Sequence, residues 1–325
     1  MIYRKLGNTG LEVSALGFGG WGIGGWEGAE DAESLRSIEM AMDMGVTLFD
    51  SALGYGNGHS EALIGKVIRS KPDRDRYIVT SKIPPKNYVF PAQPGSPVAE
   101  AYPADWIVEC TEKSLKNFGL DVIDIQHFHV WTNDWDQGDE WKEAIERLKA
   151  EGKIRLFGPS INFPYSEADD GIAMMNDGRF DIMQVVHNIY QQEPESDIFP
   201  AAEKNGVGII ARCPLDEGAL SGKITPETVF PEGSFLETYF KEDRKKIAYE
   251  KAQAMNWLME EGFAGSLAEA ALRYSISFPA VSSTIAGMRN PKHAEANCAA
   301  IEKGPLPEEV LVRLKAHAFD HNWWI

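Results

Sequence analysis

The sequence predicts a (β/α)8 TIM barrel that follows an N-terminal β-hairpin and is followed by an extra C-terminal helix. Short apolar runs alternate with amphipathic helical segments eight times, which favours a closed parallel sheet. No G-x-G-x-x-G motif opens a helix after a strand, and the runner-up fold, a doubly wound open sheet, would usually have one. Barrels commonly reach 325 residues in one unit, so we expect a single domain over residues 1–325.

The first half of the chain establishes the alternation. Residues 2–13 form two strand-like runs around a turn at Asn8 and Gly10, which predicts the hairpin. The helix after the first barrel strand ends at Gly45, the second helix begins at Ser60 and the third spans residues 104–118. The first four predicted barrel strands are residues 13–20, 46–52, 76–83 and 121–130.

The second half continues the pattern. Trp141, Ile145 and Leu148 share one face of the helix that ends at Gly152. Helix starts are indicated by a capping box from Ser266 to Glu269 and by the pair Asn290 and Pro291. The last four predicted strands are residues 153–162, 182–188, 206–215 and 280–287, and residues 308–318 form the closing helix.

Two long connections interrupt the repeat, at residues 84–103 and 216–247. Each follows a predicted strand, so each should overhang the face at which the strands end. In TIM barrels that face holds the active site, and we therefore expect both connections to shape it.

Composition excludes several classes of protein. A net charge of −17 argues against a broad surface for nucleic acid or anionic membranes, so any phosphate site must be local. The N-terminus has no signal-peptide pattern, and no apolar stretch approaches the roughly 20 residues of a membrane span. Cys110, Cys213 and Cys298 are widely spaced and indicate reduced thiols. We expect a cytoplasmic protein that binds neither nucleic acid nor a membrane.

Four polar residues lie where adjacent predicted strands end: Asp50, Tyr55, Lys82 and His129. A tyrosine has an ordinary pKa of about 10, and a neighbouring ammonium such as that of Lys82 would lower it. A buried lysine needs a counter-charge, which Asp50 can supply. His129 could hydrogen-bond a substrate oxygen and direct it toward Tyr55.

Eight segments occur together in one order: RKLGNTGLEVSALGFGG, FDSALGYGNGHSE, SK, DVIDIQHFH, EGKIRLFGPS, QVVHNIYQQ, PLDEGALSGK and AGMRNPKHAEAN. With them the sequence resembles the aldo-keto reductase superfamily over essentially its whole length. The resemblance implies reversible reduction of a small aldehyde, ketone or aldose by NADP(H), which would lie extended across the barrel mouth. It implies a catalytic tetrad of Asp50, Tyr55, Lys82 and His129, with Tyr55 as the acid in reduction and the base in oxidation.

The resemblance also implies the residues that bind the cofactor. Ser160, Asn162 and Gln184 match positions that hold the carboxamide, and Arg212 replaces an aromatic residue that many members stack on the nicotinamide. The pyrophosphate loop matches Pro214, Leu215, Gly218, Leu220, Ser221, Gly222 and Lys223. The segment that meets the 2′-phosphate and the adenine contains Gly287, Arg289, His293 and Asn297.

Other positions leave the substrate and alternative functions open. Trp21 and Trp131 follow the first and fourth strands and are candidates for an aromatic substrate pocket. Trp323 and Trp324 could cover the mouth or anchor a partner subunit. His127 is expected to be a hydrogen-bonded core residue.

One alternative is a non-catalytic NADP(H)-binding sensor or regulatory subunit on the same fold. A metal-dependent barrel hydrolase or isomerase ranks third, since Asp50, His59, Glu61 and His129 match no recognised zinc pattern, and no metal is expected. The sequence does not predict the oligomeric state.

Overall fold

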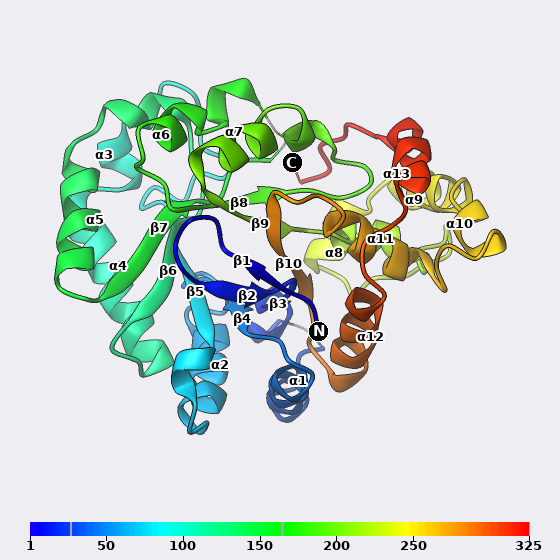
Figure 1. Ribbon diagram of the computed structural model, residues 1–325, viewed down its shortest axis with the longest axis horizontal. Helices are drawn as coiled ribbons and strands as arrows, with labels where there is room; N and C mark the ends of the chain where they lie inside the picture. The colour runs from blue at the N-terminus through cyan, green and yellow to red at the C-terminus, as the bar shows by residue number, and fades with distance from the viewer. Residues whose placement is uncertain (27, 164–165, 325) are drawn as a thin grey trace.

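The computed structural model describes residues 1–26, 28–163 and 166–324. Within these ranges, eight parallel strands form a nearly closed barrel in the order β7, β6, β5, β4, β3, β10, β9, β8 (Figure 1). The ring is completed between β7 and β8 by a parallel bridge from Ser160 to Gln184, where the Ile161 N–H donates to the Gln184 carbonyl at 2.8 Å. The strands are β3 (Leu16–Gly19), β4 (Leu48–Asp50), β5 (Ile78–Ile83), β6 (Ile123–Phe128), β7 (Ile154–Pro159), β8 (Ile182–Val186), β9 (Gly208–Arg212) and β10 (Val281–Gly287).

The predicted hairpin is present as β1 (Tyr3–Lys5) paired antiparallel with β2 (Glu12–Ser14). Its apolar side chains Leu6 and Val13 pack on isoleucine and leucine residues at the barrel centre, which closes the end where the strands begin. A Cβ on Gly7 (φ +53°) would lie 2.4 Å from the Gly206 carbonyl oxygen, so this close approach requires glycine. With this end closed, the opposite end remains for a site.

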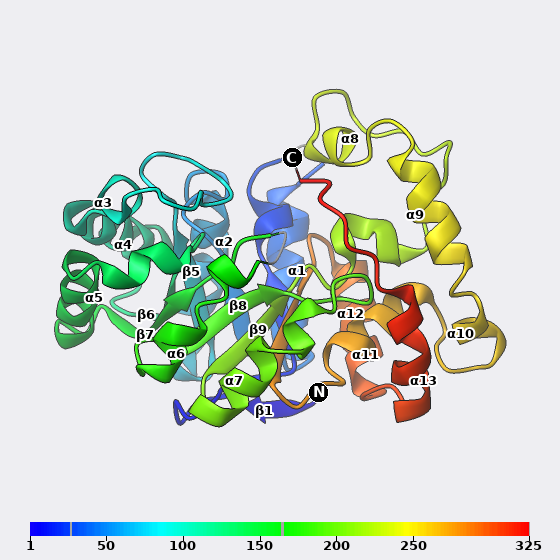
Figure 2. The same ribbon diagram turned by 90° about the horizontal axis from the view of Figure 1, so that it is seen from above.

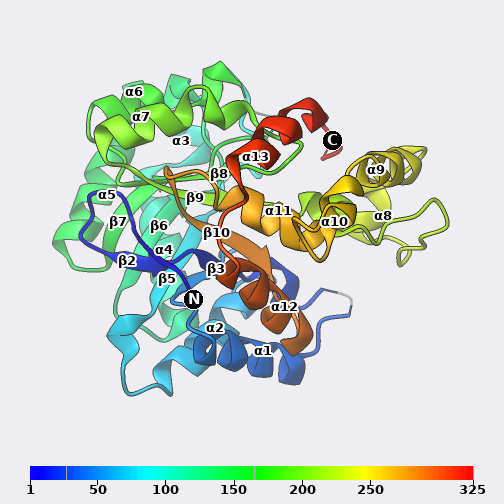
Figure 3. The ribbon, with the colours of Figure 1, turned by 45° about the vertical axis from the view of Figure 1, so that its right-hand side comes forward.

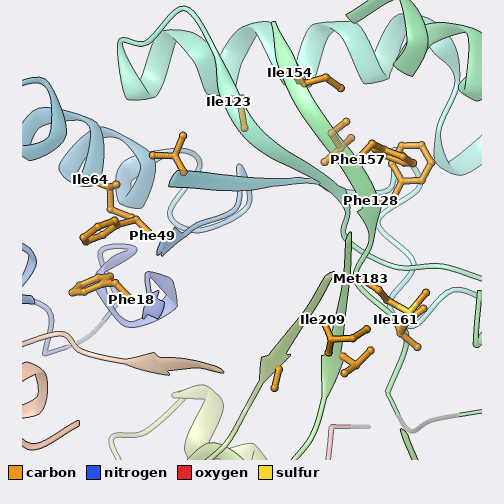
Figure 4. Packing of buried hydrophobic residues seen from close by; sticks show 14 of the residues in the cluster. Phe18, Phe49, Ile64, Ile123, Phe128, Ile154, Phe157, Ile161, Met183 and Ile209 are labelled. Atoms are coloured by element: carbon orange, nitrogen blue, oxygen red, sulfur yellow. The ribbon is translucent and has the colours of Figure 1, made fainter. Parts of the chain in front are cut away.

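Helices surround the strands and bury the main apolar core. α1 packs against both α12 and α2, and Figure 3 shows α1 between them. Between strands and helices lie large aromatic and branched side chains such as Phe18, Phe49, Phe128 and Phe157 (Figure 4). The surrounding helices are α1 (Asp31–Asp43), α2 (His59–Arg69), α4 (Ala104–Phe118), α5 (Glu140–Ala150), α6 (Ile172–Asn176), α7 (Ile198–Asn205), α11 (Leu267–Ser275) and α12 (Pro291–Glu302).

The two long connections contain short helices of their own. Residues 84–103 include α3 (Val98–Ala101), and residues 216–247 include the 3-10 segment η6 (Asp216–Ser221), α8 (Phe235–Tyr239) and the start of α9 (Arg244–Gln253). After α10 (Trp257–Glu260) and the barrel's last units, α13 (Glu308–Leu314) forms the extra C-terminal helix. Figure 2 shows the tail running from α13 back toward α8.

The sequence predicted most element positions closely. The helix predicted at 104–118 is α4 with those bounds, and the Asn290 side chain caps α12 by accepting from the His293 N–H at 3.0 Å. The predicted capping box differs in one arm: Ser266 accepts from the Glu269 N–H at 3.1 Å, but the Glu269 carboxylate accepts from Gly265 at 3.2 Å. Because Glu269 also pairs with Arg273 and Lys303, its carboxylate is held away from the Ser266 N–H.

Candidate functional site

Two charged residues from neighbouring strands form a buried ion pair at the open end of the barrel. Asp50 ends β4 and Lys82 lies near the end of β5, and their side chains are 2% and 1% exposed. Lys82 Nζ lies 2.7 Å from Asp50 Oδ2, donates to the Ser51 carbonyl at 2.8 Å and lies 3.5 Å from Tyr55 Oη. The second carboxylate oxygen, Oδ1, accepts from Thr80 at 2.6 Å and from Gln184 at 2.8 Å. Both charges are therefore fully hydrogen-bonded, as buried charges require.

The turn after β4 presents Tyr55 to this pair. Gly56 has φ +64°, and a Cβ there would lie only 1.8 Å from the Gly24 carbonyl oxygen, so only glycine allows the chain to turn at this point. The Tyr55 ring then meets the His129 ring edge-on, with centroids 5.9 Å apart. His129 follows β6, so strands β4, β5 and β6 together assemble the four predicted side chains.

Burial controls the protonation of these groups. It raises the pKa of Tyr55 well above 10, with a smaller contribution from the Asp50 carboxylate and an opposing one from Arg212. Burial likewise lowers the pKa of Lys82, against the attraction of Asp50, and burial followed by the charge of Lys82 holds the pKa of His129 well below 6.5. At neutral pH Tyr55 is a protonated donor and His129 is uncharged.

This result corrects one expectation. The sequence predicted that Lys82 lowers the pKa of Tyr55, but burial and the Asp50 carboxylate outweigh the opposing charge of Arg212 and raise that pKa. The main physical reason is burial, which disfavours the charged phenolate, and the Asp50 carboxylate adds to it while it also offsets the charge of Lys82 at 2.7 Å.

A cavity of about 210 Å³ is lined by three of the four side chains, those of Tyr55, Lys82 and His129, while Asp50 lies behind Lys82. The lining of the cavity combines polar and apolar residues. The lining residues are Tyr55, Lys82, Phe90, Pro91, His129, Val130, Ser160, Ile161, Asn162, Phe163, Gln184, Arg212 and Trp324.

Four residues expected to meet the nicotinamide line this cavity: Ser160, Asn162, Gln184 and Arg212. Gln184 donates to Asp50, while its Oε1 atom is buried with no hydrogen-bond partner among the described residues. Arg212 Nη2 donates to the Ile161 carbonyl at 3.0 Å. Asn162 differs, because its amide oxygen and nitrogen are both engaged at 3.1 Å by the backbone of Ala92 in the 84–103 connection.

The predicted pyrophosphate loop follows β9 and turns sharply. Gly218 (φ +104°) and Gly222 (φ +72°) allow the turn, Leu220 anchors it in the interior, and Lys223 is exposed. The turn also contains Pro214, Leu215 and Ser221. The loop also contains Glu217, which the sequence reasoning missed, and burial together with Asp216 raises its pKa to about 7.

A basic cluster lies at the start of α12. Burial lowers the pKa of His293, and so do the nearby charges of Arg289 and Lys223, which places the three groups in one region. The Asn297 side chain donates to the Gly287 carbonyl at 3.3 Å and holds the end of β10 against the helix. No ion pair within the described ranges includes Arg289 or Lys223. In a chain of net charge −17, this cluster at a helix N-terminus could hold an anion.

The two tryptophans predicted for the substrate pocket are not in its lining. Trp131 is fully buried and packs edge-on against Trp135, Trp141 and Phe180, so it is a core residue. Trp21 is 40% exposed and lies 5.7 Å from the rings of both Trp26 and Phe235, beyond the lining of the cavity. Because each tryptophan follows a strand, it lies at the predicted end of the barrel. The direction of its side chain, however, depends on its rotamer and on its packing neighbours.

Sequence reasoning missed the apolar residues that do line the cavity. Phe90 and Pro91 come from the 84–103 connection, which the sequence predicted only to overhang the site, and Phe163 follows β7. Trp324, for which the sequence left a mouth cover or a subunit anchor open, is part of the lining. These residues come from segments far apart in the sequence, so only the tertiary structure shows that they line one cavity.

Three further features of the described residues concern metal binding, membrane spans and His127. Across residues 1–26, 28–163 and 166–324, no group of three or more His, Cys, Asp or Glu side chains is placed to hold a metal ion. Within the same ranges no helix is long and apolar enough to cross a membrane. His127 lies fully buried with its Nδ1 atom 3.1 Å from the Gly158 carbonyl oxygen, as expected for a core histidine.

The fold and site combine a parallel barrel with a buried Asp–Lys pair, a tyrosine and a histidine, and comparisons with known proteins identify the family. The model of the aldo/keto reductase family matches residues 15–318, and the chain belongs to this family. Aldo-keto reductase YhdN of Bacillus subtilis is 31% identical over 91% of this chain and 87% of its own length. A putative voltage-gated potassium channel subunit beta of Schizosaccharomyces pombe is 29% identical over 92% and 88%. The structure of aldo-keto reductase AKR11C1 from Bacillus halodurans, in its holo form, has a TM-score of 0.74 at 26% identity and covers all of both chains.

Proposed function

We propose that this protein is an NADPH-dependent reductase of small carbonyl compounds that acts reversibly through Tyr55. The observation that supports this most is the contact of Lys82 Nζ with both Asp50 and Tyr55 directly beneath the 210 Å³ cavity. We further propose that residues 1–325 form one cytoplasmic domain, consistent with a family match over residues 15–318 and with free cysteines at positions 110, 213 and 298.

The residues in and around the cavity fit a nicotinamide adenine dinucleotide phosphate. The unpartnered Oε1 of Gln184 can accept from the carboxamide N–H, beside the Ser160 hydroxyl. The turn around Gly218 offers backbone N–H groups for the diphosphate, and a Cβ there would meet open space. Arg289 and Lys223 can supply the positive charge for a 2′-phosphate, with His293 beside them.

When bound, NADPH supplies the hydride that the carbonyl carbon accepts. The Tyr55 hydroxyl donates its proton to the carbonyl oxygen as negative charge develops there. Lys82 lies 3.5 Å from the same phenol oxygen and stabilises the anion that the proton leaves behind, while Asp50 keeps the ammonium in place. His129 is neutral and can direct the carbonyl oxygen toward Tyr55 through a hydrogen bond. In the reverse direction the tyrosinate accepts the proton.

A second candidate is a non-catalytic NADP(H)-binding regulatory subunit. The chain is similar to a protein named as a putative voltage-gated potassium channel subunit beta, and this similarity supports a regulatory role as the second candidate. The assembled set of four side chains under an open cavity is the reason for preferring the enzyme.

The proposal is tested by titrating the protein with NADPH and with NADH while the quenching of tryptophan fluorescence is measured. Carbonyl compounds are then added to the same sample. Tight binding that prefers NADPH, with oxidation of the cofactor on adding carbonyl, is the expected result. Binding without turnover over a broad panel of aldehydes and ketones would favour the regulatory subunit, and absence of binding would refute both candidates.

A further inference from the structure

Five of the apolar residues that line the cavity form a surface that we call the aromatic wall: Phe90, Pro91, Val130, Phe163 and Trp324. Phe90 meets the His129 ring edge-on at 5.3 Å, and the Trp324 ring lies 5.8 Å from that of Phe163. The only side-chain polar atom in this wall is the indole N–H of Trp324, which is buried and has no partner among the described residues.

Several polar side chains that line the cavity are already engaged. Lys82 is bound to Asp50 and Ser51, Gln184 donates to Asp50, and both ends of the Asn162 amide are taken by Ala92. If the nicotinamide uses Ser160, the free oxygen of Gln184 and Arg212, whose buried Nε has no partner among the described residues, Tyr55 and His129 remain to hydrogen-bond a substrate. Their rings lie edge-on with centroids 5.9 Å apart in the same lining, so the two side chains can bind one oxygen, that of the reacting carbonyl.

Two sets of contacts fix the wall in place. The paired hydrogen bonds between Asn162 and Ala92 hold the segment that carries Phe90. The C-terminal tail is held where His321 Nε2 lies 3.2 Å from Asp216 Oδ2 and where Arg244 donates to the Trp323 carbonyl at 2.8 Å. These contacts position Trp324, whose ring also packs on Phe235 and Tyr239 at 5.5 Å. The wall is thus formed before any substrate arrives, which favours rigid, flat ligands.

We propose that the aromatic wall selects carbonyl compounds with a planar aromatic body over aldoses, and that Trp324 and Phe90 are specificity-determining residues. This inference rests on the proposed reductase function. A sugar aldehyde would place its hydroxyls against side chains that offer a single donor and no free acceptor, and unpaired buried hydroxyls are unfavourable. An aryl aldehyde instead places its ring between aromatic faces and edges.

Three aldehydes test the selection by steady-state NADPH oxidation: benzaldehyde, butanal and D-erythrose. Butanal and erythrose have the same four-carbon chain and differ by three hydroxyls. We expect kcat/KM to fall in that order, with butanal at least about tenfold above erythrose, because one unpaired hydroxyl already accounts for such a factor. Erythrose equal to or better than butanal would overturn the selection while leaving the reductase intact. No oxidation with any of the three, despite NADPH binding, would overturn the proposed function and the selection together.

Trp324→Ala tests the wall itself. We expect kcat/KM for benzaldehyde to fall about tenfold, mainly through KM, while butanal changes by less than about threefold. The matched control is Trp257→Ala, since Trp257 packs on Phe263 and Arg313 in the outer helices, away from the cavity lining. If Trp324→Ala does not fold, Phe90→Ala replaces it, because Phe90 is 47% exposed and its removal opens no core. If the variant loses equal factors in kcat/KM for benzaldehyde and for butanal, the substituted residue has a structural role and does not determine specificity.

Discussion

The buried pair of Asp50 and Lys82 allows its structural and catalytic contributions to be separated. Lys82→Met removes the ammonium and leaves the Asp50 carboxylate buried with only the neutral donors Thr80 and Gln184. Asp50→Asn leaves the ammonium without its counter-charge. Removing one partner of a buried ion pair destabilises a protein by about 3–5 kcal/mol, so each single variant is expected to lose that much.

The double variant Asp50→Asn with Lys82→Met should be more stable than either single variant. It buries no charge, and the retained amide oxygen at position 50 can still accept from Thr80 and Gln184 as the carboxylate does at 2.6 and 2.8 Å. We expect it to lie within about 2 kcal/mol of the unmodified protein, because replacing a whole buried pair is often close to neutral. Turnover should stay low in all three variants, since none retains both groups beneath Tyr55.

Urea unfolding followed by tryptophan fluorescence provides the four free energies of the double-mutant cycle. A coupling energy of several kcal/mol is the expected result. If the double variant is as unstable as the sum of the single variants, the two side chains act independently and the ion-pair reasoning is wrong. If the double variant recovers turnover along with stability, the pair has no catalytic role.

Three other predictions follow from the site and its surroundings. Tyr55→Phe should bind NADPH with unchanged affinity and lose about 10²–10⁴-fold in kcat; equal loss of binding and turnover would make Tyr55 structural. Arg289→Ala should weaken NADPH by about 1.5–3 kcal/mol more than NADH, as measured by fluorescence titration, because only NADPH has the 2′-phosphate, and an equal loss would remove Arg289 from that role. Burial lowers the pKa of His321, but its hydrogen bond and ion pair with Asp216 outweigh burial and raise it. The contact of protonated His321 with Asp216 therefore stabilises the fold fully below pH 6.5, and this stabilisation is lost as pH rises through the higher pKa of the folded state. Thermal unfolding should show a decline in stability over that range, and His321→Gln should abolish the decline.

The sequence by itself determined the barrel and the position of its reactive end. Alternation of apolar strands and amphipathic helices is a local pattern, and its eightfold repetition leaves a closed parallel sheet as the simplest way to bury every apolar face. Because parallel strands end at one face, the residues at the ends of β4, β5 and β6 had to converge there, which is why Asp50, Lys82 and His129 could be located in advance.

Tertiary structure alone decided how the groups behave and what surrounds them. Trp131 follows a strand as predicted, yet its ring enters the aromatic core, because side-chain direction depends on neighbours from other elements. The pKa of Tyr55 depends on burial and on Asp50, which the order of residues does not reveal. The cavity wall joins Phe90 and Phe163 to Trp324 from the end of the chain, and contacts over such separations arise only when the barrel brings distant loops to one mouth.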